Sequence, residues 1–148
     1  MGKIKGLSLF FFVGVAEAYL EELGVEIRIA NEIDKDRAQF YQDIYKNTNM
    51  ICGDITDDSV RDKVVKESIE QEVNFIIATP PCQGMSEAGL RLEFDPRNQL
   101  ISYAIDVIKR LKPKFVLLEN VPKQLKTKIQ YGDKIVLIPE YIKSELGH

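Results

Sequence analysis

Apolar strand-like runs alternate with amphipathic helix-like segments along the first 119 residues, and this order is the strongest constraint on the fold. Consecutive parallel strands need a crossover connection, usually a helix, so the alternation predicts a mostly parallel sheet with helices on both faces. The sequence therefore predicts a doubly wound α/β domain. The expected strands are 6–12, 25–30, 49–53, 73–78 and 114–119, and the expected helices are 15–24, 34–47, 58–72 and 97–112.

Polar side chains follow four of these strands. In open parallel sheets, ligands bind beyond the carboxyl ends of the strands, so residues at these positions are candidates for a site. Each of them alone also has a structural explanation, as a helix cap, a loop charge or an inert core cysteine. Together, on one sheet edge, they favour a functional site. They are Glu32, Asp54, Cys82 and Glu119.

The segment "ATPPCQG" follows the apolar run "VNFIIA", which is predicted to be a buried strand, as is "KFVLLE". Two prolines cannot continue a strand ladder, so Cys82 is expected in a strand-end loop. A free thiol ionises at about pH 8.5 and needs activation to act as a nucleophile. If it is desolvated, Glu119 could keep a proton and donate it to a ring nitrogen. Glu32 could bind ribose hydroxyls and Asp54 an exocyclic amine.

Charge and composition narrow the class of protein. The 148 residues suit one domain, with 45% apolar and 29% charged residues and a net charge of −3. Residues 1–108 carry a net −8 and residues 109–148 a net +5, so the basic end could face phosphate, although a run such as "KRLKPK" is more often a solvated helix end. Lysines before "GLSLFFFVGVAEA" imitate a secretory signal, in which case Cys52 and Cys82 would be disulfide candidates. The opposing interpretation makes "GLSLFFF" the first strand of a cytoplasmic protein.

These motifs resemble the amino-terminal half of the DNA cytosine-C5 methyltransferases. "ATPPCQGMSEAGL", then "DPRNQL" and "LLENVP", are similar to that family's catalytic loop, next helix and Glu-Asn-Val motif, in order. "LSLF", "ANEID" and "CGDIT" are similar to its three earlier motifs. The resemblance covers nearly the whole chain and implies the Rossmann-like fold of methyltransferases that use S-adenosylmethionine. It also favours the first-strand interpretation and makes Cys52 a reduced, buried cysteine.

The resemblance implies the chemistry and the site. Cys82 would attack C6 of a cytosine flipped out of double-stranded DNA, Glu119 would protonate N3, and C5 would take a methyl group from S-adenosylmethionine. It implies neither a metal nor a membrane, and enzymes of this kind serve restriction-modification systems. It assigns Gln83, Ser86, Arg97 and Asn120 to the catalytic loop and its support, and Phe10, Gly14, Glu32, Ile33, Asp54, Ile55, Pro80 and Leu100 to the cofactor pocket.

Two departures from the family pattern modify these expectations. Phe12 and Val15 stand where the family has glycines that let the backbone approach the cofactor, so we expect S-adenosylmethionine to bind weakly or not at all. The family's later motifs and target-recognition domain are absent from residues 1–148, which form an incomplete catalytic domain. The chain could be a subunit completed by a second polypeptide, which its ending at an element boundary slightly favours, or a truncated remnant, or a fragment.

Two further alternatives remain at this stage. An inactive remnant could serve as a binding module that uses the sheet edge for a partner. A tRNA cytosine-C5 methyltransferase of the same family would share the cysteine chemistry and differ in its substrate. We expect the chain alone to be inactive, or to need a complementing polypeptide.

Overall fold

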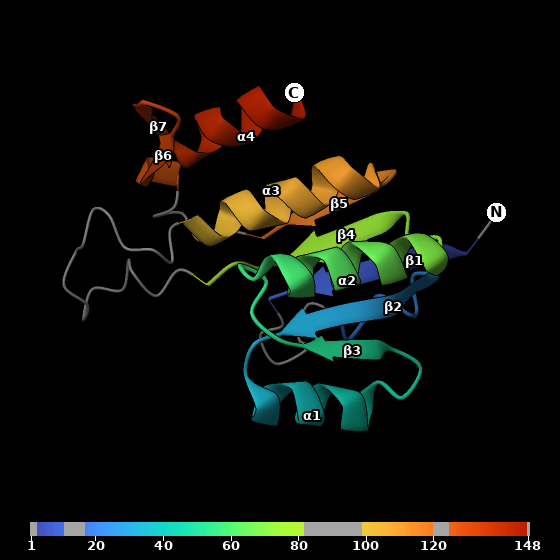
Figure 1. Cartoon of the computed structure of the whole chain (residues 1–148). Helices are drawn as coiled ribbons and strands as arrows, with labels where there is room; N and C mark the ends of the chain where they lie inside the picture. Colours follow the sequence, from blue (N-terminus) through green and yellow to red (C-terminus); the bar gives the residue numbers. More distant parts are fainter. Residues whose placement is uncertain (1–2, 11–16, 82–98, 120–124, 148) are drawn as a thin grey trace.

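The computed structural model describes residues 3–10, 17–81, 99–119 and 125–147, and a parallel sheet forms its centre (Figure 1). Within this part of the chain the sheet has five strands in the order β3-β2-β1-β4-β5, and all neighbouring pairs are parallel. The doubly wound α/β fold is thereby confirmed. The strands are β1 (Ile4–Leu9), β2 (Val25–Glu32), β3 (Asn49–Cys52), β4 (Phe75–Ala78) and β5 (Phe115–Leu118).

Helices lie on both faces of the sheet. Helices α2 (Asp58–Glu70) and α3 (Leu100–Leu111) cover one face, where Ile29 and Ile51 belong to the main hydrophobic core. Ala30, which follows Ile29, and Met50, which precedes Ile51, pack instead with Tyr41 of α1 (Lys35–Ile44). Because successive strand residues point to opposite faces, α1 covers the face opposite α2 and α3.

The first expected helix does not form in the part of it that is described. Residues 17–24 make a series of turns, with N–H groups donating to carbonyl groups three residues back. The Ser8 hydroxyl of β1 donates to the buried carboxylate of Glu17, and Leu20 packs against the sheet. These two anchors hold the segment against the sheet in place of a free helix. Gly24, at φ +79°, ends the segment in a left-handed conformation that glycine adopts readily.

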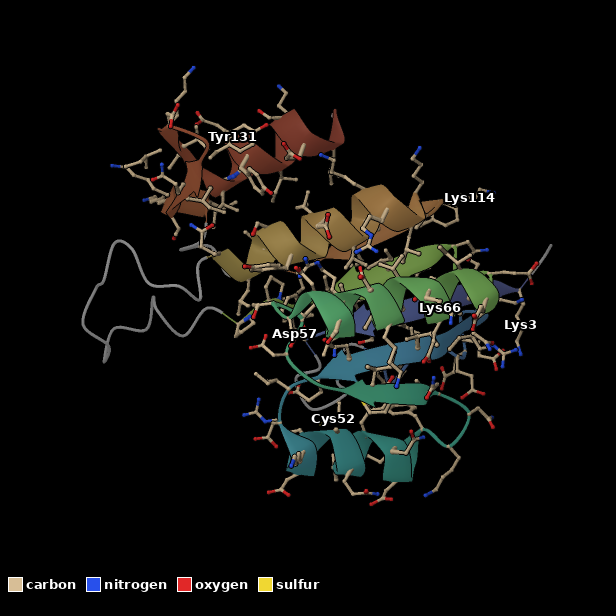
Figure 2. All side chains as sticks on the ribbon, in the orientation of Figure 1. Lys3, Cys52, Asp57, Lys66, Lys114 and Tyr131 are labelled. Carbon is tan, nitrogen blue, oxygen red and sulfur yellow. The ribbon has the colours of Figure 1, made fainter. Side chains whose placement is uncertain are left out.

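Two expectations about burial are wrong. Strand β5 is not buried on both faces: Phe115, Val116 and Leu117 are 48%, 38% and 49% exposed, because β5 is an edge strand in the described part of the chain. Cys52 is a free thiol but is exposed, because it ends β3, the strand at the other edge (Figure 2). In both cases the side chains are exposed because they lie on an outermost strand of the described sheet, where a central strand would bury them.

A small module after residue 124 was not anticipated. Strands β6 (Lys128–Tyr131) and β7 (Lys134–Leu137) form an antiparallel hairpin, followed by α4 (Ile138–Leu146). Ile129, Ile138 and Tyr141 join the same core as the buried face of α3. Residues 125–147 are therefore folded onto α3, above the sheet in Figure 1.

Candidate active site at the carboxyl edge of the sheet

The carboxyl ends of the parallel strands bring most of the described candidate residues to one edge of the sheet (Figure 1). The described candidates are Phe10 after β1, Glu32 and Ile33 at the end of β2, Asp54 and Ile55 after β3, Pro80 after β4, Leu100 at the start of α3, and Glu119 after β5. The other candidates lie outside the described residues: Gly14, Cys82, Gln83, Ser86, Arg97 and Asn120, together with Phe12.

Glu32 is a buried acid at this edge. Its side chain is 5% exposed, and Oε1 accepts a hydrogen bond of 2.9 Å from the Asp34 N–H. Burial raises the pKa of the Glu32 carboxyl group, although the hydrogen bond from Asp34 acts in the opposite direction. Such a carboxylate can accept from further donors, so Glu32 fits the role of binding hydroxyl groups better than that of a surface charge.

Glu32→Gln is expected to raise the urea midpoint of unfolding at neutral pH. Burial raises the pKa of Glu32 in the folded protein, so its carboxyl group contributes fully to stability only below its unfolded pKa of about 4.5. This contribution is lost as the pH rises through the folded pKa. At neutral pH the buried charge costs stability, which glutamine avoids while its oxygen still accepts from Asp34. The exposed Glu70→Gln is the matched control. An unchanged midpoint at neutral pH, or an equal gain at acid pH, would contradict this account.

Asn31 holds the loop after β3 in place. It is 3% exposed, and its Nδ2 donates to the carbonyl groups of Ile51 (2.9 Å) and Gly53 (3.0 Å). The Gly53 N–H in turn donates to the Glu32 carbonyl at 2.9 Å. Gly53 is needed there because a Cβ atom would lie 2.9 Å from a methyl group of Val60 on α2. The start of the Asp54 loop is thereby tied to the strand that ends in Glu32.

Asp54 and Ile55, the two candidate residues of that loop, differ in solvent exposure. Asp54 is exposed, and its Oδ1 accepts from the Thr56 N–H at 2.9 Å. Ile55 is 4% exposed and belongs to the main core, so it supports the loop from beneath. Arg61 of α2 holds the same loop by donating to the carbonyl groups of Ile55 (3.1 Å) and Thr56 (3.2 Å). Ile33, by contrast, is 62% exposed, so the two isoleucines do not line one surface equally.

Phe10 leaves β1 in an unusual conformation. Its φ is +60°, a left-handed value that costs a bulky residue roughly 1–2 kcal/mol. The Thr79 hydroxyl donates to the Phe10 carbonyl at 2.7 Å, and the Thr79 N–H donates to the Leu9 carbonyl at 3.2 Å. The half-buried Phe10 ring packs against the main core. The turn after β1 is therefore bound to the segment that leads into the two prolines.

The end of β5 differs in part from what the sequence predicts. The Glu119 N–H donates to the Ala78 carbonyl at 3.0 Å, which ties it to the end of β4. However, Glu119 is exposed, so the described residues provide no desolvated setting for its carboxyl group. Pro80 is buried and Leu100 is half-buried, and both lie at the same edge. In the part of the chain that the structure describes, no cluster of acids, cysteines and histidines could hold a metal ion, and no helix could cross a membrane.

Sequence reasoning missed Asn31 and Thr79. Both act through side-chain hydrogen bonds to backbone carbonyl groups that lie 20 or more residues away in the sequence. None of these bonds leaves a periodic signal. The only hint was position: Asn31 immediately precedes Glu32, and Thr79 immediately precedes the two prolines.

A comparison with protein families shows which family this chain belongs to. A model of the C-5 cytosine-specific DNA methylases matches residues 4–137. The chain belongs to this family. Among the curated relatives, the Type II methyltransferase M1.HgaI of Avibacterium volantium is 44% identical over 149 residues, covering 97% of this chain and 42% of the relative. M.NgoPII of Neisseria gonorrhoeae is 39% identical over 123 residues, covering 82% of this chain and 34% of the relative.

A solved structure supports the methyltransferase fold. A prophage-encoded protein from E. coli, described as a DNA modification methyltransferase, superposes with a TM-score of 0.65 and 26% identity. The match covers 80% of this chain and 32% of that one. This chain thus spans less than half the length of the relatives it matches, and it corresponds to their amino-terminal part.

Proposed function

We propose that this chain is the amino-terminal, catalytic half of a DNA cytosine-C5 methyltransferase acting on a cytosine flipped out of double-stranded DNA. The observation that carries the proposal is the pairing of β4 with β5, in which Ala78 lies opposite Leu118. Cys82 follows the first of these strands by four residues and Glu119 follows the second directly. This register supports a nucleophile and a proton donor on adjacent strands of the ligand-binding edge.

The proposed reaction divides the chemistry between these two residues. The Cys82 thiolate bonds to C6 of cytosine, the C5=C6 electron pair shifts toward C5, and Glu119 gives N3 a proton. S-adenosylmethionine, when bound, supplies an electrophilic methyl group. C5 would take that methyl group as the methyl–sulfonium bond breaks and S-adenosylhomocysteine is left, and C5 then passes its own proton to water. The freed electron pair re-forms the C5=C6 bond, the sulfur leaves as thiolate, and N3 returns its proton to Glu119.

The residues at the β2 and β3 ends fit an adenosine-containing cofactor, and the family generally uses S-adenosylmethionine. The buried Glu32 carboxylate suits ribose hydroxyls, the exposed Asp54 carboxylate suits the adenine amine, and the half-buried Phe10 ring suits the adenine face. Phe12 still leads us to propose weak binding, because a benzyl group replaces a glycine in the turn. A micromolar dissociation constant for the chain alone would contradict that part of the proposal.

The exposed edge strand supports completion by a further polypeptide segment. Leu118 packs on the core beneath α3, so alternation places Phe115 and Leu117 on the other face, beside Phe75 and Ile77 of β4. An edge strand with large, half-exposed apolar side chains is an aggregation risk that proteins normally cover. The missing portion of the relatives, more than half of their length, is the occupant we propose for this edge.

Leu117→Lys is expected to weaken association with a polypeptide that carries the carboxyl-terminal part of the enzyme by about 30-fold or more. Fully burying a leucine contributes about 2 kcal/mol, and a lysine there would in addition be buried without a designed partner. Folding should change little, because Leu117 is 49% exposed. Ile69→Lys on α2, at a residue 61% exposed, is the matched control. If the two variants bind the polypeptide with equal affinity, β5 is not part of the interface.

The function is tested by transfer of labelled methyl from S-adenosylmethionine to DNA, with the chain alone and mixed with a polypeptide carrying the missing motifs. Incorporation only in the mixture is the expected result. Incorporation into tRNA and not DNA would favour the tRNA enzyme of the same family. A folded mixture that labels neither nucleic acid would favour a binding module derived from a methyltransferase.

A further inference from the structure

Thr79 joins the two loops that the proposed function needs to hold in register. It is the first residue after β4, and it makes both of its bonds to the end of β1. Its N–H continues the parallel ladder by one step, donating to Leu9 at 3.2 Å. Its hydroxyl goes further and donates to the carbonyl of Phe10 at 2.7 Å, 69 residues away in the sequence.

The Thr79 hydroxyl bonds to the backbone at a residue whose conformation is unfavourable. The ladder between β1 and β4 runs from the pair Gly6 and Phe75 to the pair Leu9 and Ala78. Phe10 then turns to φ +60°, a conformation that a residue of its size adopts only when its surroundings hold it there. The Thr79 hydroxyl bonds to the carbonyl that this turn redirects, so it holds the turn and, through it, the position from which the Phe10 ring extends.

We infer that Thr79 is a positioning residue that clamps the cofactor-side turn at Phe10 to the Pro80–Pro81 segment preceding Cys82. This inference rests on the proposed function, in which the first loop meets the adenine and the second carries the nucleophile. Transfer between two bound groups requires both to be held close to their reacting geometry. A side chain bonded to the turn on one side and covalently continuous with the proline segment on the other can provide that register.

The test compares Thr79→Val with Thr79→Ser. Valine keeps the branched shape and the backbone N–H but removes the hydroxyl, whereas serine keeps the hydroxyl. Hydrogen exchange followed by mass spectrometry on peptides covering 4–10 and 75–81 should be about fivefold faster in Thr79→Val, the factor that corresponds to the ~1 kcal/mol of a typical net hydrogen bond. Thr79→Ser should restore slow exchange. The dissociation constant of S-adenosylhomocysteine should rise by a similar factor in the valine variant alone.

The possible results separate this inference from the proposed function. Equal exchange in the wild type and Thr79→Val would overturn the clamp. Faster exchange in Thr79→Val with an unchanged dissociation constant would overturn its positioning role. Faster exchange that serine reverses supports the clamp even if the wild type fails to bind S-adenosylhomocysteine. That failure would count against the proposed cofactor and not against the hydrogen bond.

Discussion

Cys82→Ser is expected to abolish methyl transfer by the completed enzyme, with a loss of about 10³-fold or more. A serine hydroxyl does not ionise near neutral pH and is a far weaker nucleophile toward C6 than a thiolate. Single-turnover transfer of labelled methyl to DNA measures the effect. Cys52→Ser is the matched control, because Cys52 is the other cysteine and lies exposed at the end of edge strand β3. Full transfer by Cys82→Ser would make the proposed mechanism wrong.

Glu119→Gln is expected to lower the same transfer rate by about 10²–10⁴-fold, the usual contribution of a positioned general acid or base. Glutamine can still hydrogen-bond to the cytosine ring but cannot give N3 a proton. The substitution should leave the fold intact, because the side chain is exposed and the backbone bond from Glu119 to Ala78 is unaffected.

Glu119→Asp provides the comparison for that experiment. Aspartate keeps the acidic group on a shorter side chain, so its rate should lie between those of the wild type and Glu119→Gln. Circular dichroism and urea unfolding should give the same midpoint for all three proteins. If Glu119→Gln transfers methyl at the wild-type rate, proton donation to N3 must come from another group.

The sheet and its ligand-binding edge could be predicted because their signals are local. Apolar runs separated by helix-like segments indicated all five parallel strands, and Asp57 caps α2 as an N-terminal acid should, accepting from the Ser59 N–H at 2.8 Å. Positions directly after the strands then indicated where Glu32, Asp54 and Glu119 would gather. The roles of these residues remain proposals.

The burial of β5 could not be predicted from its own residues. The run "FVLL" has the same composition whether neighbours cover it or leave it at an edge, because burial is decided by what lies beside it. The covering segment we propose corresponds to the part of the relatives that this chain does not span. The exposure of Cys52 has the same origin, since β3 forms the opposite edge of the sheet.

The hairpin β6–β7 is a different case, because its signal was present. Gly132 and Asp133 separate the two short runs "KIQY" and "KIVL", and Gly132 takes φ +59°, as tight hairpin turns require. The turn at 17–24 had a helix-like pattern instead, and the contact between Glu17 and Ser8, together with the packing of Leu20, shows why it stays on the sheet. Such contacts, like those of Asn31 and Thr79, are set by the tertiary structure.

The most direct test of the central claim is a search for the covalent adduct on Cys82. The chain and its completing polypeptide are incubated with S-adenosylmethionine and a duplex containing 5-fluorocytosine, whose C5 cannot lose a proton after methylation, so the sulfur cannot leave C6. Mass spectrometry should find methylated fluorocytosine attached to the peptide that contains Cys82 and to no other peptide. Methyl transfer to ordinary DNA by the same mixture, without any adduct on Cys82, would contradict the account.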